Sequence, residues 1–135
     1  MYMEKNGYVI TKNNGVMAGA EAKESEIVRE ISSKEELEEL IERIPFIQTI
    51  QAPNSKVRKS FYQTAMEKYD DLEWVSIIKS VHLRMAEGRY EQFEVDYLKK
   101  ARKFLYGEIS VQFGIPFEGV EKFLNETIEK QLKEF

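Results

Sequence analysis

Residues 33–45 read SKEELEELIERIP, and this stretch decides the fold class. Ser33 and Glu36 have the serine-to-glutamate spacing of a capping box, in which each side chain bonds a free backbone N–H at a helix start. Apolar residues then recur at positions 37, 40, 41 and 44, the spacing of one helix face, and Pro45 ends the run. The stretch therefore predicts an amphipathic helix that buries one face against other elements.

Four further helical segments follow, separated by short connections. The second opens at Pro53 or Asn54, and Asp70-Asp71 caps the third. The fourth runs from about residue 94 to residue 113, where Gly114 stops it, and the fifth follows Pro116. We expect these buried residues: Phe61, Ala65 and Met66; Leu72, Val75, Ile78 and Val81; Tyr97, Leu98, Ala101, Leu105, Ile109 and Val111; Val120, Phe123, Leu124, Ile128 and Leu132. The sequence predicts a mainly α fold, a compact bundle of about five helices.

The first residues follow a different pattern. Residues 7–11 favour a β-strand, Asn13-Asn14-Gly15 is a tight-turn signal, and residues 16–18 can return as a second strand. A lone hairpin is marginally stable in water, so it should lean on the helices or on another chain. We divide the chain into residues 1–26, a short hairpin and linker, and residues 27–135, a helical domain.

Composition excludes several classes of protein. The chain has 135 residues, the size of one typical domain, and lacks cysteine, which excludes disulfides and thiolate sites. No apolar run approaches the ~20 residues of a membrane span, and no signal peptide opens the chain, so we expect a cytoplasmic protein. The net charge is −4, yet residues 51–110 hold 11 Lys/Arg against 9 Asp/Glu. This mildly basic middle permits a phosphate-binding face.

Motifs for catalysis and for metal binding are missing from the sequence. There is no glycine-rich phosphate loop, zinc motif or calcium loop. The single histidine, His82, has neither an orienting carboxylate nor a nucleophile in its sequence context. We therefore expect no enzyme activity, no catalytic residues, no cofactor and no metal.

Three segments resemble the CarD/CdnL family of bacterial transcription regulators. Residues 74–84, WVSIIKSVHLR, are similar to the family's IKLIKTLYLR helix. Residues 97–115, YLKKARKFLYGEISVQFGI, are similar to its FLKRAEKLLYEEFALVLGI segment, and residues 29–36 to its MREILSKEE entry into the first helix. The segments keep the family's order and spacing, so the resemblance covers about residues 27–132.

The resemblance implies a role in transcription. Family members bind RNA polymerase through an N-terminal Tudor-like barrel, and their helical domain contacts promoter DNA near the upstream edge of the melted region. These contacts stabilise the open complex. Residues 7–16 resemble the family's opening strand and turn, but the chain before residue 27 is too short for the roughly five strands of a closed barrel. We expect a shortened polymerase-interacting region with Tyr8, Val9 and Ile10 as partner-binding residues, and the missing strands weigh against polymerase binding.

The candidate DNA-binding residues are Lys56, Arg58 and Lys59 at the start of the second helix, with Arg84 at the end of the third. Their charges could neutralise phosphates and release counterions. Arg58 is the best match to the family's basic patch, and Arg84 matches the arginine that closes the family's helix. The alternative interpretation is a solvated helix end, because the chain is acidic overall.

The chain departs from the family in its missing strands and in a missing tryptophan, and these departures leave another function open. Gln51 or Ser55 stands where the family has a tryptophan that enters the minor groove, so DNA affinity would rest on backbone contacts alone. The chain could instead be an interaction module that has lost DNA and polymerase binding, forming a homodimer through open strand edges of the hairpin. A second basic run, residues 99–103, is divided around its helix, and we interpret it as a solvated face.

Overall fold

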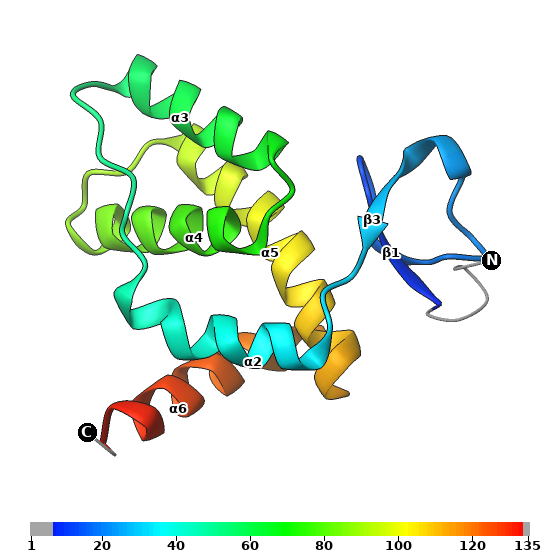
Figure 1. The fold of residues 1–135 in the computed structure, drawn as a ribbon. Coiled ribbons are helices and arrows are strands. Elements are labelled where there is room, and N and C mark those ends of the chain that lie inside the picture. The colour runs from blue at the N-terminus through cyan, green and yellow to red at the C-terminus, as the bar shows by residue number, and fades with distance from the viewer. Residues whose placement is uncertain (1–6, 134–135) are drawn as a thin grey trace.

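The computed structural model describes residues 7–133 and places five helices beside a small antiparallel sheet (Figure 1). The helices are α2 (Lys34–Arg43), α3 (Ser55–Glu67), α4 (Asp71–Ala86), α5 (Gln92–Phe113) and α6 (Val120–Lys133), with 3-10 turns η1 (Glu24–Glu26), η2 (Ile44–Phe46) and η3 (Phe117–Gly119). The mainly helical fold predicted from the sequence is confirmed. Within residues 7–133 no helix is long and apolar enough to cross a membrane.

The sheet has three strands, whereas the sequence predicted a two-stranded hairpin. Strand β1 (Tyr8–Thr11) pairs antiparallel with β2 (Gly15–Ala18) and, on its other side, with β3 (Ile27–Glu30). Strand β3 escaped prediction because its pattern is inverted: the charged Arg29 is partly buried, whereas the apolar Val28 is exposed. The proposed division of the chain between residues 26 and 27 stays a prediction.

Local capping groups set the helix ends. The Ser33 hydroxyl accepts the Glu36 N–H at 3.1 Å, and the Glu36 carboxylate accepts the Ser33 N–H at 2.9 Å. This reciprocal pair completes the predicted capping box of α2. Asn54 caps α3 and Asp70 caps α4 through side-chain oxygens. Gly114 ends α5 in the left-handed conformation, with φ 65°.

The apolar core surrounds α5, and most predicted core positions belong to it. The buried ones are Ala65, Met66, Val75, Ile78, Val81, Leu98, Ala101, Leu105, Ile109, Val120 and Leu124, and Tyr97, Val111, Phe123 and Ile128 are half-buried. The predictions for Phe61, Leu72 and Leu132 were wrong, because these side chains are 40–49% exposed. Tyr62 and Trp74 are fully buried instead, since Tyr62 bonds a buried carboxylate and Trp74 stacks on a phenylalanine of α5.

The sheet packs against α5 at two glycines. A Cβ on Gly107 of α5 would lie 2.8 Å from Cγ2 of Val16 in β2. Gly15, with φ +69° at the start of β2, would place a Cβ 2.9 Å from Cγ of Lys103. Glycine at both positions therefore allows the hairpin to approach the helix closely.

A polar cluster, here the junction network of Arg29, Asp71 and Glu108, fastens β3 to the helices. Arg29 forms ion pairs with Glu108 at 2.8 Å and with Asp71 at 3.3 Å. Its Nε also donates to the carbonyl of Tyr69 at 2.9 Å, and its guanidinium lies 5.3 Å from the centre of the Trp74 ring. One arginine thus joins the sheet to α4, to α5 and to the turn between α3 and α4.

Candidate nucleic-acid interface

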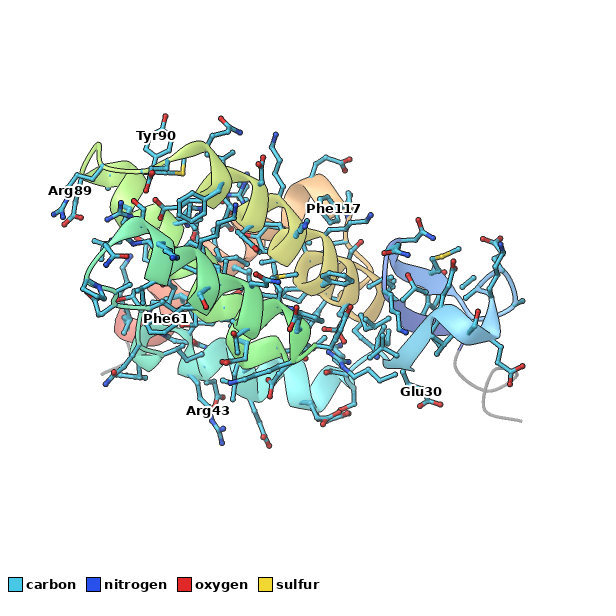
Figure 2. All side chains as sticks on the ribbon, turned by 90° about the horizontal axis from the view of Figure 1, so that it is seen from above. Glu30, Arg43, Phe61, Arg89, Tyr90 and Phe117 are labelled. Atoms are coloured by element: carbon cyan, nitrogen blue, oxygen red, sulfur yellow. The ribbon has the colours of Figure 1, made fainter. Side chains whose placement is uncertain are left out.

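The residues predicted to contact DNA gather at one end of the helical domain. Lys56, Arg58 and Lys59 lie in the first two turns of α3, and Arg84 lies in the last turn of α4. The loop after α4, which turns at Gly88 with φ +69°, brings the start of α5 back to α3. Figure 2 shows that this loop lies far from the sheet, with Arg89 and Tyr90 at its tip.

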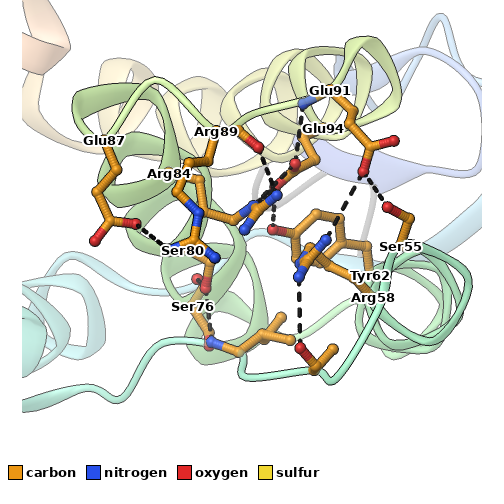
Figure 3. Close-up of polar contacts among 12 residues, drawn as sticks. Ser55, Arg58, Tyr62, Ser76, Ser80, Arg84, Glu87, Arg89, Glu91 and Glu94 are labelled. Atoms are coloured by element: carbon orange, nitrogen blue, oxygen red, sulfur yellow. Dashed lines mark hydrogen bonds and ion pairs between the residues drawn. The ribbon is translucent and has the colours of Figure 1, made fainter.

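Arg84 is held by Glu94, which is fully buried in the first turn of α5 (Figure 3). The Nε of Arg84 lies 2.8 and 3.0 Å from the two carboxylate oxygens of Glu94. The Tyr62 hydroxyl donates to the same carboxylate at 2.9 Å, and the backbone N–H of Glu91 donates at 3.0 Å. Burial, reinforced by the Glu94 carboxylate, raises the pKa of Tyr62, so its hydroxyl remains a donor. Both oxygens of Glu94 are therefore satisfied, and Arg84 is fixed in place.

Arg58 has weaker partners than Arg84. Its Nη1 lies 3.8 Å from the carboxylate of Glu91, whose side chain is 45% exposed. Its Nη2 donates to the carbonyl of Ala52 at 3.4 Å. The Arg58 side chain is itself only 10% exposed, so its two contacts are long but lie largely out of solvent.

Three arginines line one cavity of about 190 Å³, here the arginine cavity. Arg58, Arg84 and Arg89 line it, and Glu87, which lies 4.0 Å from Arg89, is the one acidic residue of the lining among residues 7–133. Residues 49–52 and the end of α4 complete the wall. The guanidinium group presents a fork of N–H donors that matches phosphate oxygens.

Further cations are exposed at this end of the domain. Lys56 and Lys59 are exposed on α3, and the Arg89 side chain is 68% exposed. Residues 54–59 and 84–94 together hold five Lys/Arg against three Asp/Glu, in a chain whose net charge is −4. One of those three carboxylates, that of Glu94, is buried against Arg84. The surface of this end is therefore locally positive.

Some residues of the site were missed in the sequence. Glu94 and Arg89 were not singled out, because charged residues after a helix usually face solvent. One local signal was available: Glu91 and Glu94 have capping-box spacing, and Glu94 accepts the Glu91 N–H. The partners Tyr62 and Arg84 come from other helices, and spacing along the chain does not reveal them.

The predicted partner-binding residues of β1 differ in exposure. Tyr8 is 40% exposed, whereas Val9 and Ile10 are 1% and 0% exposed. Ile10 belongs to the main core. The assignment of Val9 and Ile10 as contact residues is therefore corrected, because neither side chain is accessible to a partner; Tyr8 alone of the three keeps an accessible ring.

The guanidinium groups of this site are hydrogen-bond donors of the kind that bind anions. Arg84 is paired with the buried Glu94, and Arg58 lies 3.8 Å from the exposed carboxylate of Glu91. Lys56 and Lys59 are exposed outside the cavity. The structure thus brings all four predicted DNA-binding residues to one end, with two in the cavity wall and two on the surface beside it. The sequence matches no family model, and no curated protein matches it.

Proposed function

We propose that the chain is a CarD-like transcription regulator whose helical domain binds the backbone of promoter DNA and helps to stabilise the open complex. The observation that carries the DNA contact is the arginine cavity, which three arginines line, together with the exposed Lys56 and Lys59 at the same end of the domain. Each cavity arginine lies within 4.0 Å of a carboxylate, so the two lysines supply the excess positive charge. Two oxygens of a phosphodiester can accept parallel hydrogen bonds from one guanidinium. The choice of promoter DNA and RNA polymerase as partners rests on the resemblance to the CarD/CdnL family over residues 27–132.

The basic residues have different roles in this interface. Arg84 is neutralised by Glu94 and shapes the cavity. Arg58 exchanges the distant Glu91 carboxylate for a DNA phosphate, and Lys56 and Lys59 neutralise flanking phosphates. Each phosphate neutralised releases counterions, so binding should weaken as salt rises, with a log–log slope of roughly −0.9 per contact.

A gel-shift titration with a promoter duplex, between about 50 and about 200 mM salt, tests the DNA contact. The double variant Lys56→Glu, Lys59→Glu should bind at least about tenfold more weakly and show a shallower salt slope. Lys99→Glu, on an exposed position of α5 outside the cavity, is the control with matched chemistry. Equal losses in the control and the double variant, or no binding at low salt, would overturn the DNA contact.

Polymerase binding is tested separately, by pull-down of RNA polymerase with the purified chain. In the proposal the three-stranded sheet makes this contact, with the exposed ring of Tyr8 contributing. We expect capture of polymerase by the chain and weaker capture by Tyr8→Ala. Retained DNA binding without any capture would leave a helical DNA-binding module and remove polymerase from the proposal.

One observation favours the alternative of a self-pairing interaction module. In the order β2–β1–β3, neither outer strand has a further strand neighbour among residues 7–133, and Val28 of β3 is 36% exposed. Open strand edges can pair with a second copy of the chain. Sedimentation equilibrium decides between the two functions: a dimer that dissociates in Val28→Lys favours self-pairing, and a strict monomer excludes it.

A further inference from the structure

A second cavity, of about 480 Å³, lies between the sheet and the helices, on a different part of the molecule from the arginine cavity. Its walls come from residues 12–13 of the hairpin turn, from the last turns of α3 and from the middle of α5. Lys12, Lys100 and Lys103 line it, and Glu67 is the only acidic residue of the lining. We call it the lysine groove. Its volume falls in the range of roughly 300–1,000 Å³ that small-molecule sites occupy.

The lysines of the groove come from two separate elements that are held together. Lys103 packs its alkyl chain over Gly15, and its Nζ donates to the carbonyl of Asn13 at 3.0 Å. Lys12 precedes Asn13, so the same contact places Lys12 at the groove beside α5. Lys12, Lys100 and Lys103 are all exposed. The Nζ of Lys100 lies 5.5 Å from the centre of the Tyr97 ring, so a base that stacks on Tyr97 requires Lys100 to turn towards the phosphates.

Aromatic rings form another wall of the lysine groove. Tyr97, Tyr69 and Phe104 line it, and the Tyr69 and Phe104 rings pack edge to face with centroids 5.8 Å apart. Tyr69 has φ 51°, the left-handed region, and its carbonyl is held by Arg29 of the junction network. Burial and the Glu67 carboxylate raise the pKa of Tyr97, so its hydroxyl remains a hydrogen-bond donor.

We propose that the lysine groove binds a nucleoside polyphosphate, with the phosphates on Lys12, Lys100 and Lys103 and the base against Tyr97 and Tyr69. Lysine ammonium groups act as point charges that bind phosphate groups, and aromatic rings can stack on any nucleobase. An inorganic anion would use only the lysines and leave the aromatic wall empty. The ligand would touch both the hairpin and the helices, and it would stabilise the docked sheet by binding the folded arrangement. This inference does not depend on the DNA contact.

Isothermal titration calorimetry on the full chain, with ATP and GTP as probes, tests the lysine groove. We expect saturable binding of at least one nucleotide, weaker binding of inorganic triphosphate and no binding of adenosine or guanosine. The double variant Lys12→Ala, Lys100→Ala should bind the nucleotide at least about tenfold more weakly. Lys99→Ala, an exposed neighbour outside the groove, should bind as the parent does. Circular dichroism checks that both variants are folded.

Each other result overturns the inference or a defined part of it. No binding of either nucleotide, or equal binding by the double variant, would remove the site. Inorganic triphosphate binding as tightly as the nucleotide would remove the aromatic contact. A double variant that loses DNA binding and keeps nucleotide binding would assign the lysines to DNA instead. The double variant Lys56→Glu, Lys59→Glu should keep nucleotide binding, which separates this test from that of the DNA interface.

Discussion

Two glutamates of α5, Glu94 and Glu108, are both fully buried and both paired with an arginine, yet their surroundings differ. Glu94 lies inside the helical domain, where donors from three helices satisfy both of its oxygens. Glu108 lies where the sheet meets the helices, and one oxygen accepts both Arg29 and the Ser32 N–H at 2.8 Å. Its other oxygen has no partner among the described residues.

The unpartnered oxygen of Glu108 makes the junction between sheet and helices sensitive to pH. Burial raises the pKa of Glu108 to about 8, and the nearby Asp71 carboxylate adds to this rise, which Arg29 only partly offsets. The charged form of Glu108 is disfavoured although Arg29 is close, because the carboxyl group is fully buried and one of its oxygens has no partner among the described residues. The junction between sheet and helices should therefore depend on pH.

The largest expected effect comes from breaking the satisfied pair. Glu94→Ala leaves the largely buried Arg84 charge without its carboxylate, with only the Arg89 carbonyl as acceptor, and removes the acceptor of Tyr62. We expect the free energy of unfolding to fall by roughly 3–5 kcal/mol, measured by urea denaturation. Asp96→Ala, an exposed carboxylate on the same helix, is the control and should change it by less than ~1 kcal/mol. A loss of similar size in both variants would contradict the role of Glu94.

The second effect distinguishes Glu108 by its pH dependence. Between about pH 4.5 and about pH 8 the unfolded chain has released the Glu108 proton while the folded chain retains it. The unfolded state then binds fewer protons, so the stability from this group is full below about pH 4.5 and is lost as pH rises towards about 8. Glu108→Gln has no titrating group at this position, so the variant does not lose this stability as pH rises. The free energy of unfolding of the variant should therefore rise relative to that of the parent across that window. Parallel curves for both proteins in urea titrations at several pH values would show that Glu108 does not titrate there.

The same contrast explains how far the sequence could predict the structure. Capping is local, and Ser33, Asn54, Asp70 and Gly114 therefore marked helix ends correctly. Strand β3 was missed because the inward position of Arg29 makes sense only with Glu108, 79 residues away. No pattern within a short window of sequence carries that partnership.

The candidate site was predictable to a similar degree. Lys56, Arg58, Lys59 and Arg84 were found from charge, position and resemblance, and they do lie at one end of the domain. Their different roles were not predictable, because the burial of Glu94 depends on three helices packing together. Phe61 and Tyr62 show the same limit: both fit a helix face, and only the carboxylate that bonds Tyr62 decides which one is buried.

A smaller effect isolates one hydrogen bond of the satisfied network. Tyr62→Phe keeps the ring and removes the hydroxyl that donates to Glu94 at 2.9 Å. Hydrogen bonds to charged groups contribute roughly 1.5–3 kcal/mol, so the free energy of unfolding should fall by about that amount. Urea denaturation measures it, and Tyr90→Phe, which alters an exposed ring, serves as the matched control. An unchanged midpoint would mean that water replaces the hydroxyl without cost.

The smallest effect on stability should come from Arg58→Ala, although Arg58 lines the same cavity as Arg84. Its nearest carboxylate is 3.8 Å away and half-exposed, so the ion pair alone contributes at most ~1 kcal/mol. The Arg58 side chain is only 10% exposed, so the variant also loses the packing of its alkyl chain. If Arg58 exchanges Glu91 for a phosphate, the variant should lose less stability than Glu94→Ala and should bind promoter DNA several-fold more weakly. A stability loss as large as that of Glu94→Ala would instead place Arg58 in the rigid network.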